Sequence, residues 1–326
     1  MNAPRTRVQR RPVHGVLLLD KPLGLSSNQA LQRAKWLLRA EKAGHTGTLD
    51  PLATGVLPLC FGAATKFSQL HLEADKTYEA TARLGVKTST GDAEGAVIAE
   101  RSVQFTGEDL CRVQSLFTGP IHQTPPMYSA LKKDGKALYE YAREGIEIER
   151  APRDVIVHQL SVTETPDVVP YRALKIAATV SKGTYIRTLG EDIGEALGCG
   201  AHLTALRRIA TGDFDVSQCV TLEALEAMTE DGRLALLLPA ESLVAGHDRV
   251  TLGTEDAARF LSGLRRRGDW ADAAEVAVFG IEPAAFLGSA HIVANELIPG
   301  RLLNPIEIQQ ILLNAPVPHF FCETTS

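Results

Sequence analysis

The sequence predicts a mixed fold of helices and strands, divided into two domains. Its 326 residues correspond to about two domains of ordinary size. Apolar residues recur at helical spacing in some segments and alternate with polar residues in others, which predicts helices and strands in succession. Beyond His247 the pattern changes to short apolar stretches with intervening glycines, which predicts a small β-rich second domain of about 65 residues.

The composition is typical of a globular protein, with 44% hydrophobic and 22% charged residues. No apolar run approaches the roughly 18 residues of a membrane span, so we expect no membrane association. Residues 1–14 lack the apolar stretch of a secretory signal. The five cysteines are scattered and never spaced as C-x-x-C, which predicts reduced thiols in a cytoplasmic protein and argues against disulfides or a zinc finger.

The first half of the chain predicts strands and helices in turn. Ser26 or Ser27 can cap a helix whose apolar face repeats every three to four residues. Tyr78 begins the apolar face of an alternating strand, and an isolated tyrosine at such a position is more often a core residue than a catalytic one. The predicted elements are strands over 14–20, 56–61 and 76–85, and helices from Ser26 or Ser27 to about residue 39, over 63–71 and over 107–117.

The second half contains one junction of particular interest. A predicted strand over 173–180 runs into a helix that starts near Ile186 and ends at Gly198, which can adopt the left-handed conformation of a helix end. Tyr185 and Arg187 lie at this junction, a common position for site residues, although Arg187 could equally be a structural ion-pair partner. The remaining predictions are a helix over 222–228 capped by Thr221, strands over 276–279 and 286–293, and a frayed end from 314 onward.

The stretch 44–58, GHTGTLDPLATGVLP, contains a candidate reactive carboxylate. Its glycines permit backbone conformations that a Cβ would resist, and Pro51 pushes Asp50 toward an extended conformation. Asp50 lies beside polar residues that include His45. Taken alone, however, an aspartate before a proline is more typical of a turn than of a catalyst.

The net charge of −5 gives no indication of a nucleic-acid partner, but basic residues cluster locally. Phosphate binding depends on local potential, which such clusters supply, although each one alone is also typical of solvated surface. Tyr139 and Tyr141 are interleaved with basic residues and could stack on bases or belong to an ordinary amphipathic helix. The clusters are Arg5, Arg7, Arg10 and Arg11; Lys132, Lys133 and Lys136; Arg207 and Arg208; and Arg265 to Arg267.

Five motifs together resemble the bacterial TruB family, the tRNA pseudouridine-55 synthases. They occur in the family's order within residues 12–245, and a looser likeness to the family's PUA-type RNA-binding module follows near the C-terminus. The motifs are DKPLGLSS (20–27), GHTGTLDPLATGVLP (44–58), KTYEATARLG (76–85), PPMYSALKKDGKALYEYAREG (125–145) and SKGTYIRTLGEDIGEALGCGAHLTALRR (181–208).

The resemblance implies an α+β catalytic domain built on a mixed, largely antiparallel sheet with flanking helices and a cleft. It implies isomerisation of one uridine in the tRNA T-loop, without a cofactor or a metal, and tRNA as the partner. A role in tRNA folding is compatible with that activity. The implied organisation is a basic arm (1–11), a catalytic domain (12–247) with an RNA-gripping insertion (127–148), a PUA-like domain (248–312) and a disordered tail (313–326).

The resemblance also assigns roles to individual residues. Asp50 is implied as the nucleophile and Arg187 as its partner, while Tyr78 is implied to pack on the target base and act in proton removal. His45, Tyr185 and Leu206 are implied to surround the flipped nucleotide, with Lys21 and Pro22 supporting the site. The candidates for contacts with the RNA backbone are Lys132, Lys133, Lys136, Arg143, Arg207 and Arg208.

The chemistry of pseudouridine formation suits a carboxylate, a guanidinium and an aromatic ring at one site. The C1′–N1 bond breaks, the base turns, and it reattaches through C5, so the product is an isomer of the substrate. A carboxylate can attack the sugar or the base, or stabilise positive charge at C1′, and the sequence leaves these routes open. A guanidinium keeps the carboxylate ionised, and an aromatic face replaces the stacking that a flipped base loses.

Two other classes of function compete with this interpretation. A non-catalytic RNA-binding protein on the same scaffold would be expected to lack Asp50, Tyr78 or Arg187, and all three are present. A metal-dependent hydrolase using His45 and Asp50 would need further ligands, and no H-E-x-x-H pattern occurs. With no dimerisation signal in the sequence, we expect a monomer.

Overall fold

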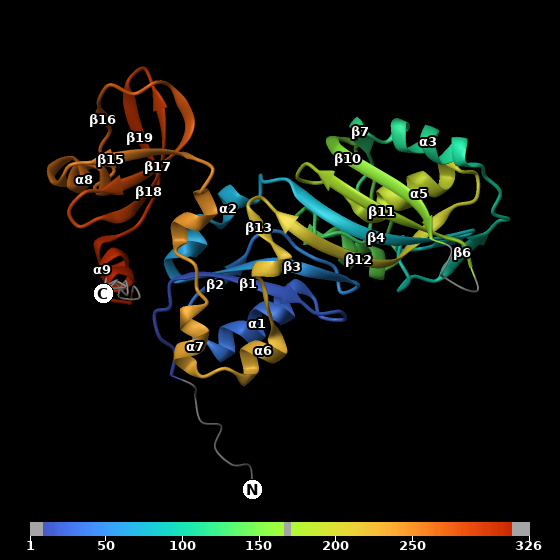
Figure 1. Cartoon of the computed structure of the whole chain (residues 1–326), viewed down its shortest axis with the longest axis horizontal. Coiled ribbons are helices and arrows are strands. Elements are labelled where there is room, and N and C mark those ends of the chain that lie inside the picture. Colours follow the sequence, from blue (N-terminus) through green and yellow to red (C-terminus); the bar gives the residue numbers. More distant parts are fainter. Residues whose placement is uncertain (1–8, 166–170, 315–326) are drawn as a thin grey trace, which may run out of the picture.

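The computed structural model describes residues 9–165 and 171–314, which form a large central sheet and a smaller C-terminal sheet (Figure 1). The central sheet has ten strands. In chain order they are β1 (Gly15–Lys21), β2 (Ala43–His45), β3 (Ala53–Phe61), β4 (Lys76–Leu84), β7 (Gly119–Gln123), β10 (Arg153–Thr165), β11 (Ala173–Val180), β12 (Ala201–Thr211), β13 (Phe214–Asp215) and β14 (Val220–Thr221). The basic arm expected at 1–11 and the tail expected at 313–326 lie largely outside the described residues.

The central sheet is mixed and largely antiparallel. Its main path runs β14-β1-β3-β12-β4-β11-β10-β7, while β2 pairs with β3 and β13 with β12. Only the β1–β14 and β3–β12 pairs of this sheet are parallel within the described residues. Strand β4 pairs antiparallel with both β11 and β12, so the predicted KTYEATARLG strand lies in the middle of the sheet. The predicted α+β class is confirmed.

Several helices pack on one face of this sheet, where they share a hydrophobic core with its strands (Figure 1). The segment α1 (Ser27–Leu37) begins at the predicted cap: the Ser26 side chain accepts from the N–H of Gln29, whose own side chain accepts from the N–H of Ser26. In α5 (Ile186–Ala196), Leu189 and Ile193 are completely buried, and each such side chain stabilises the fold by roughly 1.5–3 kcal/mol. The remaining helices of this region are α2 (Ser68–His71), α3 (Gly107–Leu116), α4 (Leu138–Arg143), α6 (Leu222–Ala227) and α7 (Glu230–Ala235).

The smaller sheet forms a β-rich unit after residue 247. Its strand order is β15-β17-β18-β19-β16, and the unit is consistent with the PUA-like domain expected from the sequence. The elements are β15 (Asp248–Leu252), α8 (Thr254–Leu261), β16 (Arg266–Arg267), β17 (Ala273–Gly280), β18 (Ala285–Val293), β19 (Glu296–Leu302) and α9 (Pro305–Asn314). None of the described helices is both long and apolar enough to cross a bilayer.

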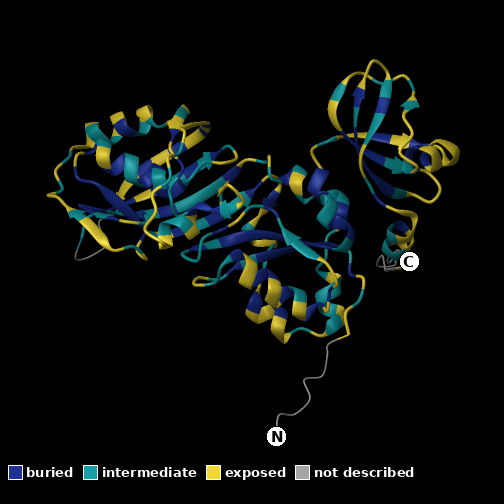
Figure 2. Ribbon diagram, turned by 180° about the vertical axis from the view of Figure 1, so that it is seen from behind, coloured by how far each residue is buried: buried dark blue, intermediate teal, exposed yellow. Residues whose placement is uncertain are grey.

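Strand β1 joins two hydrophobic cores because its side chains alternate between the faces of the sheet. Leu17 and Leu19 enter the core beneath α1 and α5, whereas Val16 and Leu18 enter a second core shared with the C-terminal sheet. Burial on both faces explains the apolar run from Val16 to Leu19 in this strand. Figure 2 shows buried residues concentrated in the strands, with the exposed residues mainly on helices and loops. The C-terminal sheet therefore packs on the face of β1 opposite to the core that contains α1 and α5.

Several segments differ from the predictions, and three of them are informative. The predicted helix over 63–71 is divided into a 3-10 turn (Gly62–Lys66) and the short α2. Strand β10 was not predicted because a register shift between Val157 and Gln159 interrupts its alternation. Strand β12 was not predicted either; it lies between β3 and β4, and its register shifts twice against β4.

Candidate active site

A cavity of about 310 Å³ opens where β3, β4, β11 and β12 meet the start of α5. Of the residues predicted for catalysis or substrate binding, five line it: Asp50, Tyr78, Tyr185, Arg187 and Leu206. These residues come from positions 50 to 206 of the sequence, and the fold brings them to one place. His45, Lys21 and Pro22 do not line this cavity.

The Asp50 loop is held from the side of α1. The hydroxyl of Ser27 donates to the carbonyl of Leu49 (2.9 Å) and accepts from its N–H (2.7 Å), so one buried hydroxyl fixes the residue before Asp50. The carbonyl of Asp50 accepts from the N–H of Ala53 (3.0 Å), which closes a turn. The two interpretations of Asp50 are thus compatible, because its backbone makes the turn and its side chain remains available.

One position in this loop, Gly47, favours glycine for both its backbone conformation and the space around it. Gly47 has φ +79°, and a Cβ there would lie 3.3 Å from the guanidinium of Arg208, which donates to the carbonyl of Gly47 (3.2 Å). Arg208 is 1% exposed and also donates to the carbonyl of Val56 (2.7 Å). Arg208 is therefore a buried support of the loop, and it lies deeper than the other residues predicted to contact the RNA backbone.

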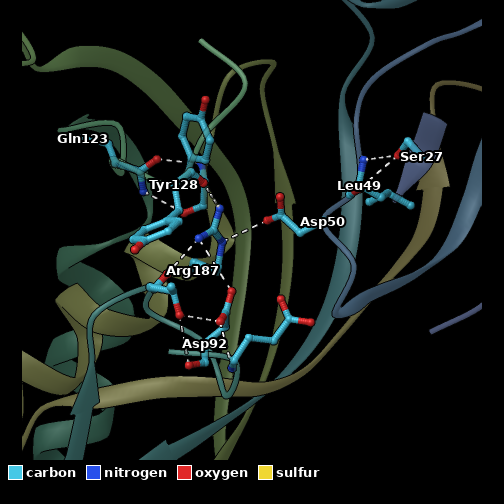
Figure 3. A network of polar contacts seen from close by, with 10 residues as sticks. Ser27, Leu49, Asp50, Asp92, Gln123, Tyr128 and Arg187 are labelled. Atoms are coloured by element: carbon cyan, nitrogen blue, oxygen red, sulfur yellow. Dashed lines mark hydrogen bonds and ion pairs between the residues drawn. The ribbon is translucent and has the colours of Figure 1, made fainter. Parts of the chain in front are cut away.

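Arg187 is the central cation of the site (Figure 3). Its side chain is 4% exposed, and its Nε lies 2.9 Å from Oδ2 of Asp50. Its Nη1 donates to the carbonyl of Thr90 (2.8 Å), and its Nη2 donates to the carbonyl of Tyr128 (2.6 Å). All three nitrogens are engaged, so the guanidinium is fixed in one orientation against the Asp50 carboxylate.

Asp92 is a second carboxylate beside Arg187, and sequence reasoning did not identify it. Its Oδ2 lies 3.6 Å from Nη1 of Arg187. Its Oδ1 accepts from the hydroxyl of Thr90 (2.6 Å) and from the N–H of Glu94 (3.1 Å). The sequence shows Asp92 only as part of a polar, glycine-containing loop, and no spacing relates it to Asp50 or Arg187.

Burial and charge act on Asp50 in opposite directions. Burial raises the pKa of the Asp50 carboxyl, the nearby Arg187 lowers it, and Asp92 raises it again, with a net direction upward. The side chain remains 38% exposed, toward the cavity. The carboxylate is thus weakly solvated, paired on one side and accessible on the other, as a nucleophile requires.

Gln123 is another residue that the sequence did not reveal. Its side-chain amide donates to the carbonyl of Tyr185 (3.1 Å), and its carbonyl oxygen accepts from the N–H of Tyr185 (2.7 Å). Tyr185 is the N-cap of α5 and its side chain makes no capping bond. A buried amide at the end of β7 therefore fixes the corner from which Tyr185 and Arg187 project.

Tyr78 and Leu206 lie on neighbouring central strands. Tyr78 of β4 is paired in register with Arg208 of β12, and Leu206 is paired with Ala80. Tyr78 is half-buried and packs partly against the main core, which places one part of its ring in the protein and another in the cavity. An apolar side chain and an aromatic ring thus face the space beside Asp50.

Lys21 and His45 lie outside the cavity, in supporting positions. The ammonium of Lys21 is buried and donates to the carbonyls of Pro22 (2.8 Å) and Leu25 (2.6 Å), which fixes the turn after β1. Burial lowers its pKa to about 8, against the attraction of Asp50. Burial, reinforced by Arg208, also lowers the pKa of His45, which favours a neutral imidazole.

Most of the basic candidates lie in a small two-stranded sheet and the helix that follows it. Lys132 and Lys133 form β8 (Lys132–Lys133), which pairs with β9 (Lys136–Ala137) ahead of α4. Lys136 pairs with Glu144 (2.5 Å), and the Arg143 guanidinium lies 5.2 Å from the ring of Tyr139. Arg207, in contrast, is in the central sheet and pairs with Asp20 (2.7 Å).

Among the described residues, no group of three or more His, Cys, Asp or Glu side chains could hold a metal ion.

Comparison with known proteins identifies the family of this chain. Residues 35–186 match the family model described as "TruB family pseudouridylate synthase (N terminal domain)", and residues 187–245 match the "tRNA pseudouridylate synthase B C-terminal domain". The chain belongs to the TruB family. It is an enzyme of the tRNA pseudouridine synthase class, an isomerase, and its substrate class is tRNA.

Similar proteins extend the match to nearly the whole chain. The tRNA pseudouridine synthase B of Verminephrobacter eiseniae is 65% identical over 96% of this chain and 96% of its own length. That of Ralstonia nicotianae is 57% identical, over 90% of this chain and 96% of its own. Among solved structures, a Cbf5–Nop10–Gar1 complex is 28% identical with a TM-score of 0.64, covering 86% of this chain and 78% of that one.

Proposed function

We propose that this TruB-family enzyme converts uridine 55 in the T-loop of tRNAs to pseudouridine, with Asp50 as the nucleophile. The observation that carries the proposal is the Asp50 carboxylate, 2.9 Å from Arg187 and facing a cavity lined by Tyr78 and Leu206. At about 310 Å³ the cavity is at the lower end of the range for single small-molecule sites, roughly 300–1,000 Å³. This size suits one flipped nucleotide better than a stacked pair.

Each residue of the site has its own role in the proposed reaction. Asp50 attacks the sugar or the base, or stabilises positive charge at C1′, while the C1′–N1 bond breaks. Arg187 keeps that carboxylate ionised before the attack. Tyr78 and Leu206 take over the stacking that the flipped uridine loses, and the phenol of Tyr78 assists removal of the C5 proton after the new C1′–C5 bond forms. Tyr185 closes the cavity beside Arg187.

The same proposal assigns parts to the rest of the chain. The catalytic domain spans 12–247, and its insertion 127–148 grips the T-stem-loop through Lys132, Lys133, Lys136 and Arg143. Residues 248–312 form a PUA-like domain that binds tRNA, and the enzyme acts as a monomer in the cytoplasm. Lys132 and Lys133 are exposed, as phosphate contacts require, whereas Arg208 is buried and we assign it to the loop instead.

A T-stem-loop RNA labelled with tritium at uridine C5 tests the reaction. We expect the wild-type enzyme to release tritium without added metal or nucleotide, and Asp50→Asn to release at least about a thousand-fold less, the scale of loss of a nucleophile. Asp50→Asn should still bind the RNA, because the substituted side chain keeps its shape. Retention of the label by the wild-type enzyme would contradict the proposal.

The position of the modified uridine needs a second RNA. In a stem-loop whose uridine 55 is replaced by cytidine, with tritium on the remaining uridines, release should stop. Continued release from that RNA would show that another uridine is the target, while leaving the isomerase activity itself intact.

A further inference from the structure

We propose that Lys76 binds a phosphodiester of the RNA backbone next to the flipped uridine, and so anchors the target nucleotide in the cavity. This inference rests on the proposed function, because it requires a nucleotide between Asp50 and Tyr78. Lys76 lines the same cavity as these two residues, yet it has no part in the chemistry described so far.

Lys76 is placed by the central strand of the sheet. It is the first residue of β4, where it pairs with Val180 on one side and Thr211 on the other. Lys76 and Tyr78 lie on the same face of β4, separated by the rise of two strand residues, about 7 Å. A base that stacks on Tyr78 would therefore bring its sugar and phosphate within reach of the Lys76 side chain.

The ammonium of Lys76 is oriented but has no counter-ion. The residue is 8% exposed, and its Nζ donates to the carbonyl of Leu72 (2.7 Å) and to that of Ala74. It forms no ion pair with a carboxylate of the described residues, although Glu73 and Asp75 are near enough to favour its charged form. An ammonium has three N–H donors, so two carbonyls leave one donor for a ligand.

The charges of the residues that line the cavity favour the binding of an anion there. The lining contains three cations, Lys76, Arg187 and Arg208, and a single carboxylate, Asp50. Arg187 is committed to Asp50 and Arg208 to the carbonyls of Val56 and Gly47, so both guanidinium groups are engaged within the protein. Lys76 is the cation of this lining that remains for a substrate anion.

The lowered pKa of Lys76 is compatible with the binding of an anion. Burial, reinforced by the nearby Arg208, lowers the pKa of the ammonium to about 8, against the attraction of Asp75 and Glu73. A phosphate oxygen at the third donor would favour the charged form and form a charge-assisted hydrogen bond. Phosphodiesters are the anions that an RNA substrate brings to this position, whatever its sequence.

The alternative is a purely structural lysine that holds the carbonyls after α2. A charge-neutral phosphate distinguishes the two roles. Two T-stem-loop RNAs each carry one methylphosphonate, either 5′ or 3′ to the target uridine, and kcat/KM is measured for each. With the wild-type enzyme we expect one of them to react on the order of ten-fold more slowly than unmodified RNA, the scale of one hydrogen bond to a charged group.

With Lys76→Met the unmodified RNA should lose a similar factor, and the sensitive methylphosphonate should cause no further loss. Lys76→Arg, which keeps the charge, should retain part of the sensitivity. The control is Lys175→Met, an exposed lysine on β11 outside this cavity, which should keep the full wild-type sensitivity. These results would support the phosphate contact.

Independent, multiplicative losses from Lys76→Met and the methylphosphonate would overturn the inference. Insensitivity of the wild-type enzyme to both methylphosphonates would overturn it as well, even if Lys76→Met failed to fold. Failure of the proposed function is distinguishable, because the wild-type enzyme would then not isomerise the unmodified RNA at all.

Discussion

The guanidinium of Arg187 contacts two carboxylates. Its Nε lies 2.9 Å from Oδ2 of Asp50, and its Nη1 lies 3.6 Å from Oδ2 of Asp92. The two carboxylates differ in exposure: the side chain of Asp50 is 38% exposed and that of Asp92 is 5% exposed. Asp92 is fixed by Thr90 and by the N–H of Glu94, so it can serve as a rigid support for the arginine. The arginine in turn orients the carboxylate that faces the cavity.

Asp92→Asn should therefore slow catalysis without removing any group that touches the RNA. We expect kcat to fall by up to about a hundred-fold, because loss of the support lets Arg187 and Asp50 shift from their productive positions. KM should change little, since Asp92 does not line the cavity. Steady-state kinetics of tritium release measure both, with Asp231→Asn on α7 as an exposed control. An unchanged kcat would show that Asp92 does not position Arg187.

The pH dependence of kcat should report the ionisation of Asp50. The carboxylate must be ionised to react, and its pKa is raised by burial, so activity should fall as pH decreases through a value above the ordinary 3.8 of aspartate. Asp92 raises the pKa of Asp50, so Asp92→Asn should move this acidic limb to lower pH. Arg187 lowers it, so Arg187→Gln should move the limb to higher pH.

These two shifts are measured as profiles of log kcat against pH at saturating RNA. Opposite movements are the expected outcome even if both variants are slower than the wild-type enzyme. A limb that stays in place in both variants would mean that another group, or a step other than the chemistry, controls the acidic side.

Gln123 should be sensitive to the loss of a single hydrogen-bond donor. Gln123→Glu keeps an acceptor for the N–H of Tyr185 but loses the donor to its carbonyl, and it brings a charge into a buried position. We expect a loss of about 1–3 kcal/mol in the free energy of unfolding, because a buried carbonyl is left without its partner. Thermal denaturation measures this loss. Gln32→Glu on the exposed side of α1 is the control, and equal melting temperatures for both variants would contradict the prediction.

The C-terminal sheet should unfold together with the central sheet. Phe67 and Phe286 are buried in one core with ring centroids 4.9 Å apart, and Lys66 pairs with Glu307 at 2.6 Å. Phe286→Ala and Phe67→Ala should each cost about 3–5 kcal/mol, and the double variant should cost less than their sum because the rings contact each other. Leu116→Ala, at a site 58% exposed, is the control.

Chemical denaturation followed separately by RNA binding and by intrinsic fluorescence measures these changes. Coincident transitions are expected. A C-terminal transition that Phe67→Ala leaves unaltered would show that the two sheets are energetically independent.

Local patterns in the sequence determined many of the elements. An N-cap at Ser26 or Ser27, the alternation of β4 and the helix after Tyr185 were predicted, because capping and periodicity depend on residues within a few positions of each other. The motifs also indicated the family, and with it the residues Asp50, Tyr78, Tyr185, Arg187 and Leu206 that meet in the cavity.

Only the tertiary structure decided what surrounds those residues. Asp92 reaches Arg187 from a loop 95 positions away, and Gln123 reaches Tyr185 across 62 positions, distances over which no sequence periodicity carries information. The same holds for Arg208, which the sequence shows as half of a basic pair and the fold buries beneath the Asp50 loop. The sequence by itself specified the reactive groups and their local elements, whereas their orientation depends on long-range hydrogen bonds and ion pairs that form only when the chain is folded.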